Sequence, residues 1–453
     1  MSIFDHQRIP SESFKIDAER MRTGWYSDKY FENITGMLTT LAQQGYRFGG
    51  FSQRLHALGI DASDIDIGNI EVEMQWFTRR KPVSLIAGVD KALALLELGT
   101  GYFDHDGNFV NTAHHLDIEA VHDGVLARYD GDPRTVRPVI KVRGRYRDFA
   151  LLETPTLGAL TRATRIATNV YNVLVAARGK PVLFFPARFD AHEVQAADGY
   201  AYNIAVQRFN ADYSASVGSF ISTDAQGDWW GGLGGGTVAH AAIAAFLGDT
   251  VECMLAFSET RPVDIPRIAL IDFDNDCVGT TLAVMDAMFA RYRELSSAGQ
   301  HEQARRYKLF GIRPDTGGTQ RDVSVPPLGD PALDLGVTPR LVFNLRQAID
   351  EAWRRWNIAP EWEERARQWC HDVRIVVTGG FSPRKIRHFE QLSVPADIYG
   401  VGASLFSNSS EEGTNNDFTA DIVRVHIHGE WVDMAKVGRQ ACPNPDLEPI
   451  VFV

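Results

Sequence analysis

Apolar and polar positions alternate over short stretches in the first third of the chain, with one helical run between them. Residues 70–77 (IEVEMQWF) alternate as a half-buried strand does. Residues 83–98 carry the period of a helix, and residues 120–146 have the pattern of a hairpin. These patterns predict an α+β domain over residues 1–150.

Short apolar stretches alternate with amphipathic ones from about residue 151 to 417. A long helix is expected from residue 156 to Gly179, because glycine commonly ends helices. Helical periodicity returns over residues 281–295 and 342–356. The expected strands cover 182–185, 217–221, 268–273, 309–312, 373–377 and 398–399. Since strands and helices alternate and no dinucleotide fingerprint follows the first strand, we expect a (β/α) barrel rather than an open doubly wound sheet.

The last part of the chain returns to strict alternation. The stretches IVRVHIHG and EWVDMAKVG predict a hairpin around Gly429, so residues 418–453 are expected to complete the α+β domain. One long segment, from Pro314 to Pro339, has little periodicity and carries Pro326, Pro327 and Pro331 in its interior. Such segments in compact domains are usually functional or disordered, and we interpret this one as a flap beside the site.

Composition narrows the class of protein. The 453 residues are 44% hydrophobic and carry a net charge of −12, which excludes disorder for most of the chain and disfavours binding to nucleic acid. The four cysteines show no CxxC spacing, so free thiols in a reducing compartment are expected and no structural zinc. There is no signal-peptide or membrane-spanning pattern, and we expect a cytoplasmic protein.

Polar and glycine residues follow nearly every expected strand of the barrel. The carboxyl ends of barrel strands converge on one face, so these residues can meet around a ligand. They are Phe185, Arg188, Thr223, Asp224, His240, Asp272, Arg313, Asp315, Gly379, Gly380, Gly400 and Gly402. Glycine pairs allow backbone N–H groups to approach an anion, while carboxylates bind sugar hydroxyls or hold Mg²⁺ through water. A phosphorylated sugar is the ligand that these groups favour together.

Each of these residues also has a structural interpretation. Glycine pairs after strands are commonly plain turns, and His240 lies among small apolar residues as a buried structural histidine would. Asp272 could cap a helix. Four further histidines lack carboxylate or cysteine partners at metal-ligand spacing and are expected at the surface: His114, His115, His426 and His428.

Taken in chain order, the strand-end motifs resemble the nicotinate phosphoribosyltransferase family over nearly the whole chain. GIRPDTGG, with Arg313 and Asp315, is similar to the family's ribose-binding segment, and TGGFSPRKI and YGVGASL are similar to its two phosphate loops. GGGTVAH resembles the motif whose histidine, here His240, is phosphorylated in ATP-coupled members. The long helix ETPTLGALTRATRIATNVYNVLVAARG and the hairpin VHIHGEWVDMAKVGR are also similar to the family's.

The same resemblance implies which residues bind the pyridine. YSDKYFENITGML is similar to the family's entry motif and places Asp28 and Tyr30 on its site, with Tyr30 stacking on the ring. The segment from Phe185 to Arg188 resembles phenylalanine-glycine-x-arginine. Phe185 would then be the second stacking surface, and Arg188 would lie near the ring substituent.

The resemblance implies a type II phosphoribosyltransferase, an irregular (β/α) barrel over 151–417 packed on an α+β domain from 1–150 and 418–453. Its implied reaction transfers phosphoribosyl from phosphoribosyl pyrophosphate (PRPP) to nicotinate, giving nicotinate mononucleotide in NAD salvage. Mg²⁺ is the implied cofactor, ATP is a co-substrate in the coupled members, and a homodimer is the implied assembly. The implied catalytic residues are His240, Asp272, Arg313 and Asp315, and the implied phosphate-binding residues are Gly379, Gly380, Gly400 and Gly402.

Departures from the family pattern leave alternatives open. Pro186 replaces a glycine, and Asp224 stands where amide-using members carry an aspartate. A carboxylate there repels the nicotinate anion and accepts a hydrogen bond from an amide, which favours nicotinamide as the base. A non-catalytic mononucleotide-binding relative is a further alternative. A barrel aldolase is disfavoured because no lysine follows the expected strands.

Overall fold

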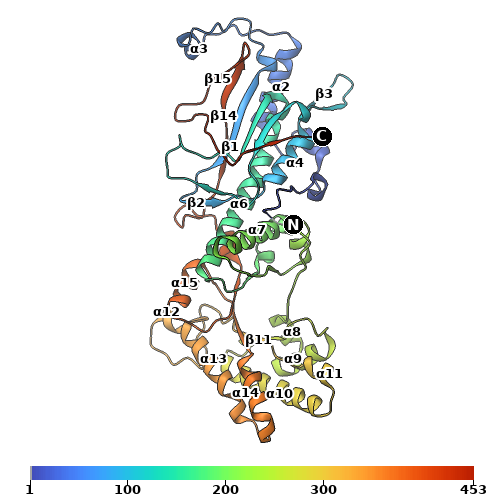
Figure 1. The fold of residues 1–453 in the computed structure, drawn as a ribbon, viewed down its shortest axis with the longest axis vertical. Coiled ribbons are helices and arrows are strands. Elements are labelled where there is room, and N and C mark those ends of the chain that lie inside the picture. The colour runs from blue at the N-terminus through green and yellow to red at the C-terminus, as the bar shows by residue number, and fades with distance from the viewer. Residues whose placement is uncertain (1–2, 453) are drawn as a thin grey trace. The chain divides into compact units, whose positions relative to one another are not determined.

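A computed structural model describes residues 3–452, which fall into two compact units (Figure 1). Unit 1 comprises the chain up to Tyr171, Ala196–Arg208 and the chain from Ser407. Unit 2 comprises Asn172–Gln195 and Phe209–Phe406. Two helices, α6 (Glu153–Ala176) and α7 (Gln195–Tyr213), carry the chain across the boundary.

Unit 1 is built on a six-stranded antiparallel sheet with the strand order β15-β14-β1-β7-β5-β16. Its strands are β1 (Glu71–Thr78), β5 (Asp117–Ala120), β7 (Ile140–Arg145), β14 (Phe418–Ile427), β15 (Glu430–Asp433) and β16 (Glu448–Ile450). His428 and Gly429 both have positive φ and make the two-residue turn between β14 and β15. The predicted hairpin around Gly429 is therefore confirmed, and the C-terminal segment returns to the first sheet.

Helices cover one face of this sheet. They are α1 (Ala18–Arg22), α2 (Lys29–Gln43), α3 (Gln53–Ala57), α4 (Val89–Gly99), α5 (Tyr146–Phe149) and α6. Val72, Met74 and Trp76 of β1 pack with Leu93 of α4 and Leu160 of α6 in one buried apolar cluster. The alternation in β1 thus sets which face the helices cover.

Two expectations for this unit are wrong in detail. Residues 83–85 form a strand, β2 (Val83–Leu85), and the helix begins only at Val89. Gly88 separates them with φ +93°, and a Cβ there would lie 2.7 Å from the Ala159 carbonyl oxygen. Residues 120–146 are no simple hairpin, because β6 (Leu126–Arg128) leaves the sheet to pair with β2 while β7 pairs with β5. A smaller hairpin joins β3 (Gly101–Phe103) to β4 (Phe109–Asn111).

Unit 2 contains a six-stranded sheet in which every pair is parallel, in the order β10-β11-β12-β13-β8-β9. The strands are β8 (Val182–Phe184), β9 (Phe220–Ile221), β10 (Ile268–Leu270), β11 (Gly311–Arg313), β12 (Arg374–Val377) and β13 (Ile398–Val401). All six expected strands are confirmed, with ends shifted by a few residues. Parallel strands linked by helices are the architecture that the alternating pattern predicted.

The sheet of unit 2 is a half-barrel. Beyond β9 the described chain adds one isolated parallel bridge, between Ile221 and Gly234, and no ladder within residues 3–452 joins this edge to β10. The glycine-rich segment 231–236 supplies this bridge in place of a strand. The closed barrel that we expected is therefore not formed by hydrogen bonds here.

Helices flank the strands of unit 2 and set their spacing. They are α8 (His240–Ala245), α9 (Thr250–Thr260), α10 (Cys277–Ser297), α11 (His301–Arg305), α12 (Pro331–Asp334), α13 (Pro339–Glu351), α14 (Pro360–His371) and α15 (Pro383–Gln391). α13 packs against both α10 and α14. The starts of α13, α14 and α15 all carry proline at the first helical position, where its missing N–H costs nothing.

The irregular segment 314–339 is bonded to its surroundings. The Asp322 carboxylate is buried and accepts hydrogen bonds from the backbone N–H of Cys277 (2.8 Å) and of Ser324 (2.9 Å). The Asp334 carboxylate accepts hydrogen bonds from the N–H groups of Leu328 and Gly329. These bonds make the segment a fixed connection to the start of α10 rather than a free flap.

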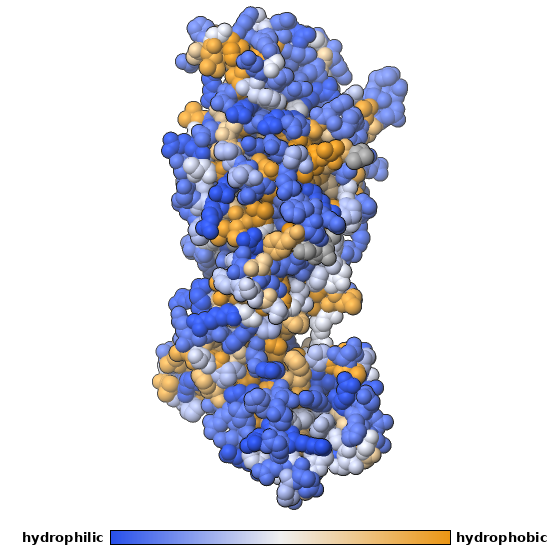
Figure 2. Space-filling model, viewed as in Figure 1, coloured by the Kyte–Doolittle hydropathy of each residue, from blue (hydrophilic) through white to orange (hydrophobic). Residues whose placement is uncertain are grey.

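The outer surface is mainly polar. Figure 2 shows a mostly hydrophilic visible face on which apolar residues form separate groups. Within residues 3–452, no helix combines the length and apolar character required to span a membrane.

Candidate active site

The carboxyl ends of the unit 2 strands carry most of the predicted site residues. Because the six strands are parallel neighbours, their carboxyl ends lie along one edge of the sheet, which we call the carboxyl edge. The residues placed there are Asp272 after β10, Arg313 and Asp315 at β11, Gly379 and Gly380 after β12, Gly402 after β13, Phe185 after β8, and Thr223 after β9.

His240 and Asp272 meet at the β10 end of this edge. His240 Nε2 lies 3.0 and 3.1 Å from the two carboxylate oxygens of Asp272, 32 positions away in sequence. The Asp272 side chain is only 8% exposed, whereas that of His240 is 46% exposed. Burial raises the pKa of Asp272, the contact with His240 opposes this rise, and the nearby Asp315 charge adds to it. His240 is thus a solvent-accessible imidazole oriented by a buried carboxylate, and its interpretation as a buried structural histidine is wrong.

Arg313 lies between carboxylates at the end of β11. Its guanidinium donates a hydrogen bond to the Val238 carbonyl (3.0 Å), while its buried Nε has no hydrogen-bond partner. Burial lowers the pKa of Arg313, and the charges of Asp315 and Asp272 oppose that effect. The positive charge of Arg188 lowers the pKa of Arg313 further. The guanidinium is therefore held rigidly but is not fully hydrogen-bonded.

Asp315 is joined to the next strand end through Thr378. The Thr378 hydroxyl donates to Asp315 Oδ1 (2.7 Å) and approaches the Pro314 carbonyl (3.2 Å). A Cβ on Gly379 would lie 3.4 Å from the same Asp315 oxygen, so carboxylate and glycine loop are in contact. Gly379 and Gly380 have φ values of +90° and +67°, which glycine adopts at little cost. Neither glycine carries a side chain that could cover its own backbone N–H.

Lys385 was not singled out in the sequence but lies under this glycine loop. Its Nζ donates to the Gly379 carbonyl (3.0 Å) and stands 4.3 Å from the centroid of the Phe381 ring. Burial lowers the pKa of Lys385 to about 8. No carboxylate among residues 3–452 forms an ion pair with it. Ser382 caps α15 and places Lys385 in its first turn, and this was the available sequence signal.

The second glycine loop is bonded to the first. The Ser404 hydroxyl donates to the Phe381 carbonyl (2.7 Å), which holds the segments after β12 and β13 together. Gly402 faces the ring of Phe189, and a Cβ there would lie 2.7 Å from its edge. The two expected phosphate loops are thus adjacent.

Gly400 is required for packing. It lies inside β13, and a Cβ on it would stand 2.5 Å from the Thr378 methyl group and 3.1 Å from the Phe185 ring. The Phe185 N–H donates to the Val401 carbonyl (2.9 Å). The absence of a side chain at Gly400 therefore lets Phe185 and Thr378 approach the same point, and its predicted role toward phosphate stays a prediction.

The β9 end carries Thr223 and Asp224. The Thr223 hydroxyl donates to Gln195 Oε1 (2.8 Å), and the Gln195 amide reaches the Ala187 carbonyl beside Arg188 (3.4 Å). The exposed Asp224 carboxylate accepts the N–H of Gly234 (2.9 Å). Sequence reasoning missed Gln195, which connects the ends of β9 and β8.

Comparison with known proteins identifies the fold. No protein-family model matches the chain. The structure is similar to that of nicotinate-nucleotide pyrophosphorylase from Pyrococcus furiosus, with a TM-score of 0.61, 21% identity, and coverage of 96% of this chain and 85% of that one. It is also similar to human nicotinic acid phosphoribosyltransferase, with a TM-score of 0.54, 16% identity, and coverage of 88% and 75%. The chain has a type II phosphoribosyltransferase fold.

In this phosphoribosyltransferase fold, the remaining predicted residues belong to unit 1. The Asp28 carboxylate accepts hydrogen bonds from the hydroxyls of Thr154 (3.0 Å) and Tyr30 (3.2 Å). Tyr30 is 56% exposed, and its ring contacts Phe31. Burial, together with the charges of Asp421 and Asp28, raises the pKa of the neighbouring Glu153 to about 8. Asp28 and Tyr30 thus form one exposed polar group in their own unit.

The family resemblance of the sequence implies Mg²⁺, and two carboxylates at the carboxyl edge fit this ion. Mg²⁺ is commonly held by one or two carboxylates together with substrate phosphates and water. Asp272 and Asp315 are close enough that the charge of Asp315 raises the pKa of Asp272. No third ligand of the His, Cys, Asp or Glu type joins them among residues 3–452. This donor set suits an ion whose other ligands come from a substrate.

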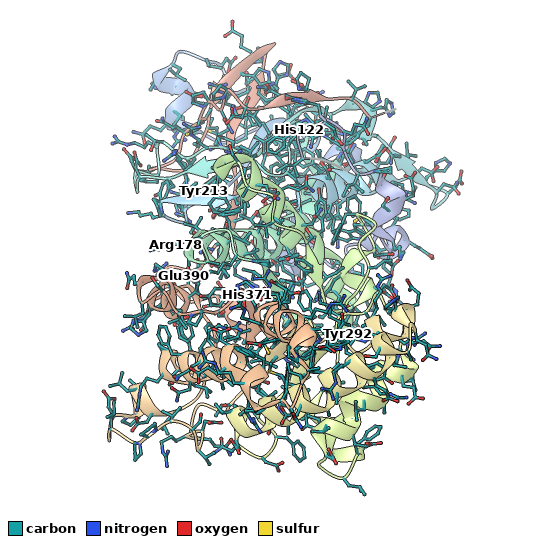
Figure 3. The ribbon with its side chains drawn as sticks, turned by 60° about the horizontal axis from the view of Figure 1, so that its bottom comes forward. His122, Arg178, Tyr213, Tyr292, His371 and Glu390 are labelled. Atoms are coloured by element: carbon teal, nitrogen blue, oxygen red, sulfur yellow. The ribbon has the colours of Figure 1, made fainter. Side chains whose placement is uncertain are left out.

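The opposite ends of the same strands, the amino edge, form a separate pocket. Its volume is about 420 Å³, and its charged lining residues are Arg178, Lys180, Arg346, Glu390 and Asp397. Figure 3 shows Arg178 and Glu390 beside each other. Lys180 Nζ lies 2.7 Å from the buried Glu390 carboxylate, which also accepts the Tyr399 hydroxyl. Charges at the amino edge are therefore largely paired.

Proposed function

We propose that the protein transfers the 5-phosphoribosyl group of PRPP to the ring nitrogen of nicotinate, forming nicotinate mononucleotide and pyrophosphate. The observation that carries the proposal is the contact between Asp315 and the Gly379–Gly380 loop through Thr378, at the carboxyl edge of this fold. A carboxylate for ribose and a glycine loop for phosphate then lie next to each other.

The 5-phosphate binds at the glycine loops. The N–H groups of Gly379 and Gly380 and the start of α15 supply hydrogen-bond donors and a favourable helix dipole. Lys385 adds a positive charge that has no carboxylate partner among the described residues. A dianionic phosphate neutralises this charge, which is why an unpaired buried ammonium is tolerated there.

The reaction breaks the bond between ribose C1 and the pyrophosphate oxygen and forms a bond from C1 to the pyridine nitrogen. C1 gains positive charge on the way, and the Asp315 and Asp272 carboxylates stabilise it. Arg313 binds the departing pyrophosphate oxygens. Asp272 and Asp315 would hold Mg²⁺, which would supply positive charge to the pyrophosphate oxygens. The protein otherwise acts by holding the two reactants in line.

Phe185 holds the pyridine ring by stacking, and Arg188 pairs with the nicotinate carboxylate. Asp224 favours a second candidate, nicotinamide, because an exposed carboxylate at the β9 end accepts a hydrogen bond from an amide and repels an anion. Its present bond with the Gly234 N–H leaves the other carboxylate oxygen for a substrate amide.

His240 couples ATP to the transfer. The Nε2–H of His240 donates a hydrogen bond to the Asp272 carboxylate, and this tautomer leaves the lone pair of Nδ1 for attack on the terminal phosphorus of ATP. The bond from that phosphorus to the bridging oxygen breaks, ADP leaves, and a phosphohistidine remains. Unchanged ATP-stimulated turnover in His240→Ala would remove this role.

The test is product analysis by mass spectrometry with PRPP and nicotinate, nicotinamide or quinolinate, with and without ATP. The proposal expects nicotinate mononucleotide to form fastest when nicotinate is the base supplied, and loss of at least about 100-fold of kcat/KM in Asp315→Asn. Asp264→Asn is the control, because Asp264 is an exposed residue before β10. No product with any of the three bases would contradict the proposal, and a preference for nicotinamide would support the second candidate.

A further inference from the structure

Two histidines and a glutamate gather in unit 1, away from every residue assigned above. His122 Nε2 lies 3.1 Å from one carboxylate oxygen of Glu448, and His6 Nδ1 lies 3.7 Å from the other. The three donor atoms all lie within 4.8 Å of one another. The two imidazole rings meet edge to face, with centroids 5.5 Å apart. Figure 3 labels His122.

Each of the three residues comes from a separately anchored segment. Glu448 begins β16, which pairs with β5 so that Glu448 stands opposite Ala120. His122 follows directly after β5, where the N–H of Val121 donates to the Val139 carbonyl (2.9 Å). The sheet therefore fixes the separation of Glu448 and His122.

The N-terminal segment is docked against the same place. The Arg8 guanidinium forms an ion pair with Asp90 (2.8 Å) and donates to the carbonyls of Ala120 and Val121. The N–H of Ile9 donates to the second Asp90 oxygen (3.0 Å). These bonds fix the chain at Arg8 and Ile9, two and three residues after His6. Contacts outside the cluster therefore place the imidazole of His6 beside Glu448.

The donor set selects the kind of ion. Two imidazole nitrogens and one carboxylate oxygen are ligands of Zn²⁺ and related divalent transition metals, whereas Mg²⁺ and Ca²⁺ prefer oxygen alone. In a tetrahedral site with bonds of about 2.0–2.2 Å, neighbouring donor atoms lie about 3.3–3.5 Å apart. Each histidine nitrogen lies near this distance from a Glu448 oxygen, at 3.1 Å from Oε2 for His122 and 3.7 Å from Oε1 for His6, so small side-chain rotations bring three donor atoms around one ion. His6 is exposed, so water can complete the coordination.

We propose that His6, His122 and Glu448 form a divalent transition-metal site that fastens the N-terminal segment and β16 to the end of β5. The ion replaces two hydrogen-bonded or ionic histidine contacts by three coordinate bonds. A ligand that binds only the folded protein stabilises it, so the metal raises the unfolding temperature. The site rests on unit 1 alone and is independent of the transferase proposal.

The test uses the full-length chain without an affinity tag, stripped of metal by a chelator. Zn²⁺ is titrated by calorimetry, Co²⁺ binding is followed by its visible absorption, and the unfolding temperature is measured with and without Zn²⁺. We expect one ion per chain, an imidazole-type Co²⁺ spectrum, and a higher unfolding temperature with Zn²⁺. His122→Ala and Glu448→Gln should each weaken binding at least about tenfold.

Two further variants distinguish loss of the metal site from misfolding and from binding at another group. His6→Ala alters an exposed side chain, so it should fold normally and still lose Zn²⁺ affinity. His105→Ala is the matched control, because His105 lies in an exposed one-turn group with Asp104 and Asp106 that offers a competing weak site. Absence of stoichiometric binding to the parent chain, or equal binding by His6→Ala and the parent, would overturn the proposal. Loss of binding in His105→Ala alone would place the ion at the other group and would also overturn it.

Discussion

Charged side chains gather at both edges of the parallel sheet in unit 2, but they are neutralised differently. At the amino edge, Lys180 pairs with Glu390, and Arg374 pairs with Asp397. At the carboxyl edge, Lys385 and Arg313 are held by backbone carbonyls and form no ion pair among residues 3–452. Paired charges satisfy one another, so removing one partner is costly, whereas unpaired buried cations favour an anionic ligand. The charges at the amino edge are thus satisfied within the protein, and the cations at the carboxyl edge are left for an anionic ligand.

The largest effect is expected at the carboxyl edge, from Asp315→Asn. The amide keeps the hydrogen bond with Thr378 but removes the negative charge beside ribose, so kcat/KM should fall by about 10²–10³-fold, equivalent to about 2.7–4 kcal/mol. The unfolding temperature should change little. Steady-state kinetics measures kcat/KM, and calorimetry measures the unfolding temperature. If Asp315→Asn lowered the unfolding temperature but kept its activity, the carboxyl edge would serve stability rather than binding.

At the amino edge, Glu390→Leu should lower stability and spare activity. The substitution leaves the buried Tyr399 hydroxyl and the Lys180 ammonium without their acceptor, which costs about 2–3 kcal/mol in the free energy of unfolding. Glu390→Gln keeps an acceptor for the hydroxyl and should lose less. Denaturant titration measures both variants. A fall in kcat/KM that exceeds the loss of folded protein would assign the amino edge a part in the reaction.

Lys385→Met should weaken the affinity for ribose 5-phosphate by about tenfold, because one charged hydrogen-bond donor is lost at the glycine loop. The pKa of Lys385 is lowered to about 8 by burial, so the ammonium is charged below that pH and neutral above it. Affinity of the parent protein should therefore fall as the pH rises through about 8, and Lys385→Met should lack this dependence.

Calorimetric titrations at several pH values measure the effect of Lys385. Lys308→Met is the control, because Lys308 is half exposed and pairs with Asp372 away from the loop. Equal affinities and equal pH profiles for the parent and Lys385→Met would show that this lysine supports the loop without acting on the phosphate.

The smallest effect is expected for Arg374→Ala at the amino edge. The Arg374 side chain is 55% exposed, and its pair with Asp397 (3.1 Å) is screened by water. Its removal should change the free energy of unfolding by about 0.2–1 kcal/mol and leave kcat/KM unchanged. If Arg374→Ala lowered the free energy of unfolding as much as Glu390→Leu does, burial of the ion pair would not determine how much each pair at the amino edge contributes to stability.

The local pattern of apolar and polar residues predicts much of the fold. The rule that parallel strand ends lie at one edge predicts much of the candidate site. Apolar strands alternating with helices predicted the six parallel strands, and the convergence of parallel strand ends placed Arg313, Asp315 and Gly379 together. The closed barrel was overpredicted because Gly234 makes a single bridge where a strand was needed.

The remaining site features depend on tertiary contacts that no local pattern encodes. The pairing of His240 with Asp272 joins a helix start to a distant strand end. Lys385 carries no motif, and only the docking of α15 directs its ammonium to the Gly379 carbonyl. Strand β2 was assigned to a helix because three residues are too few to show a strand period.

The central claim is that PRPP binds at the carboxyl edge of the unit 2 sheet. Hydrogen exchange with and without PRPP tests it most directly, since exchange rates report where the ligand contacts the backbone. The account predicts slower exchange at residues 378–382 and 402–406, with no change at residues 178–180 and 393–397. Protection confined to the amino edge, or unchanged exchange at both edges under saturating PRPP, would contradict it.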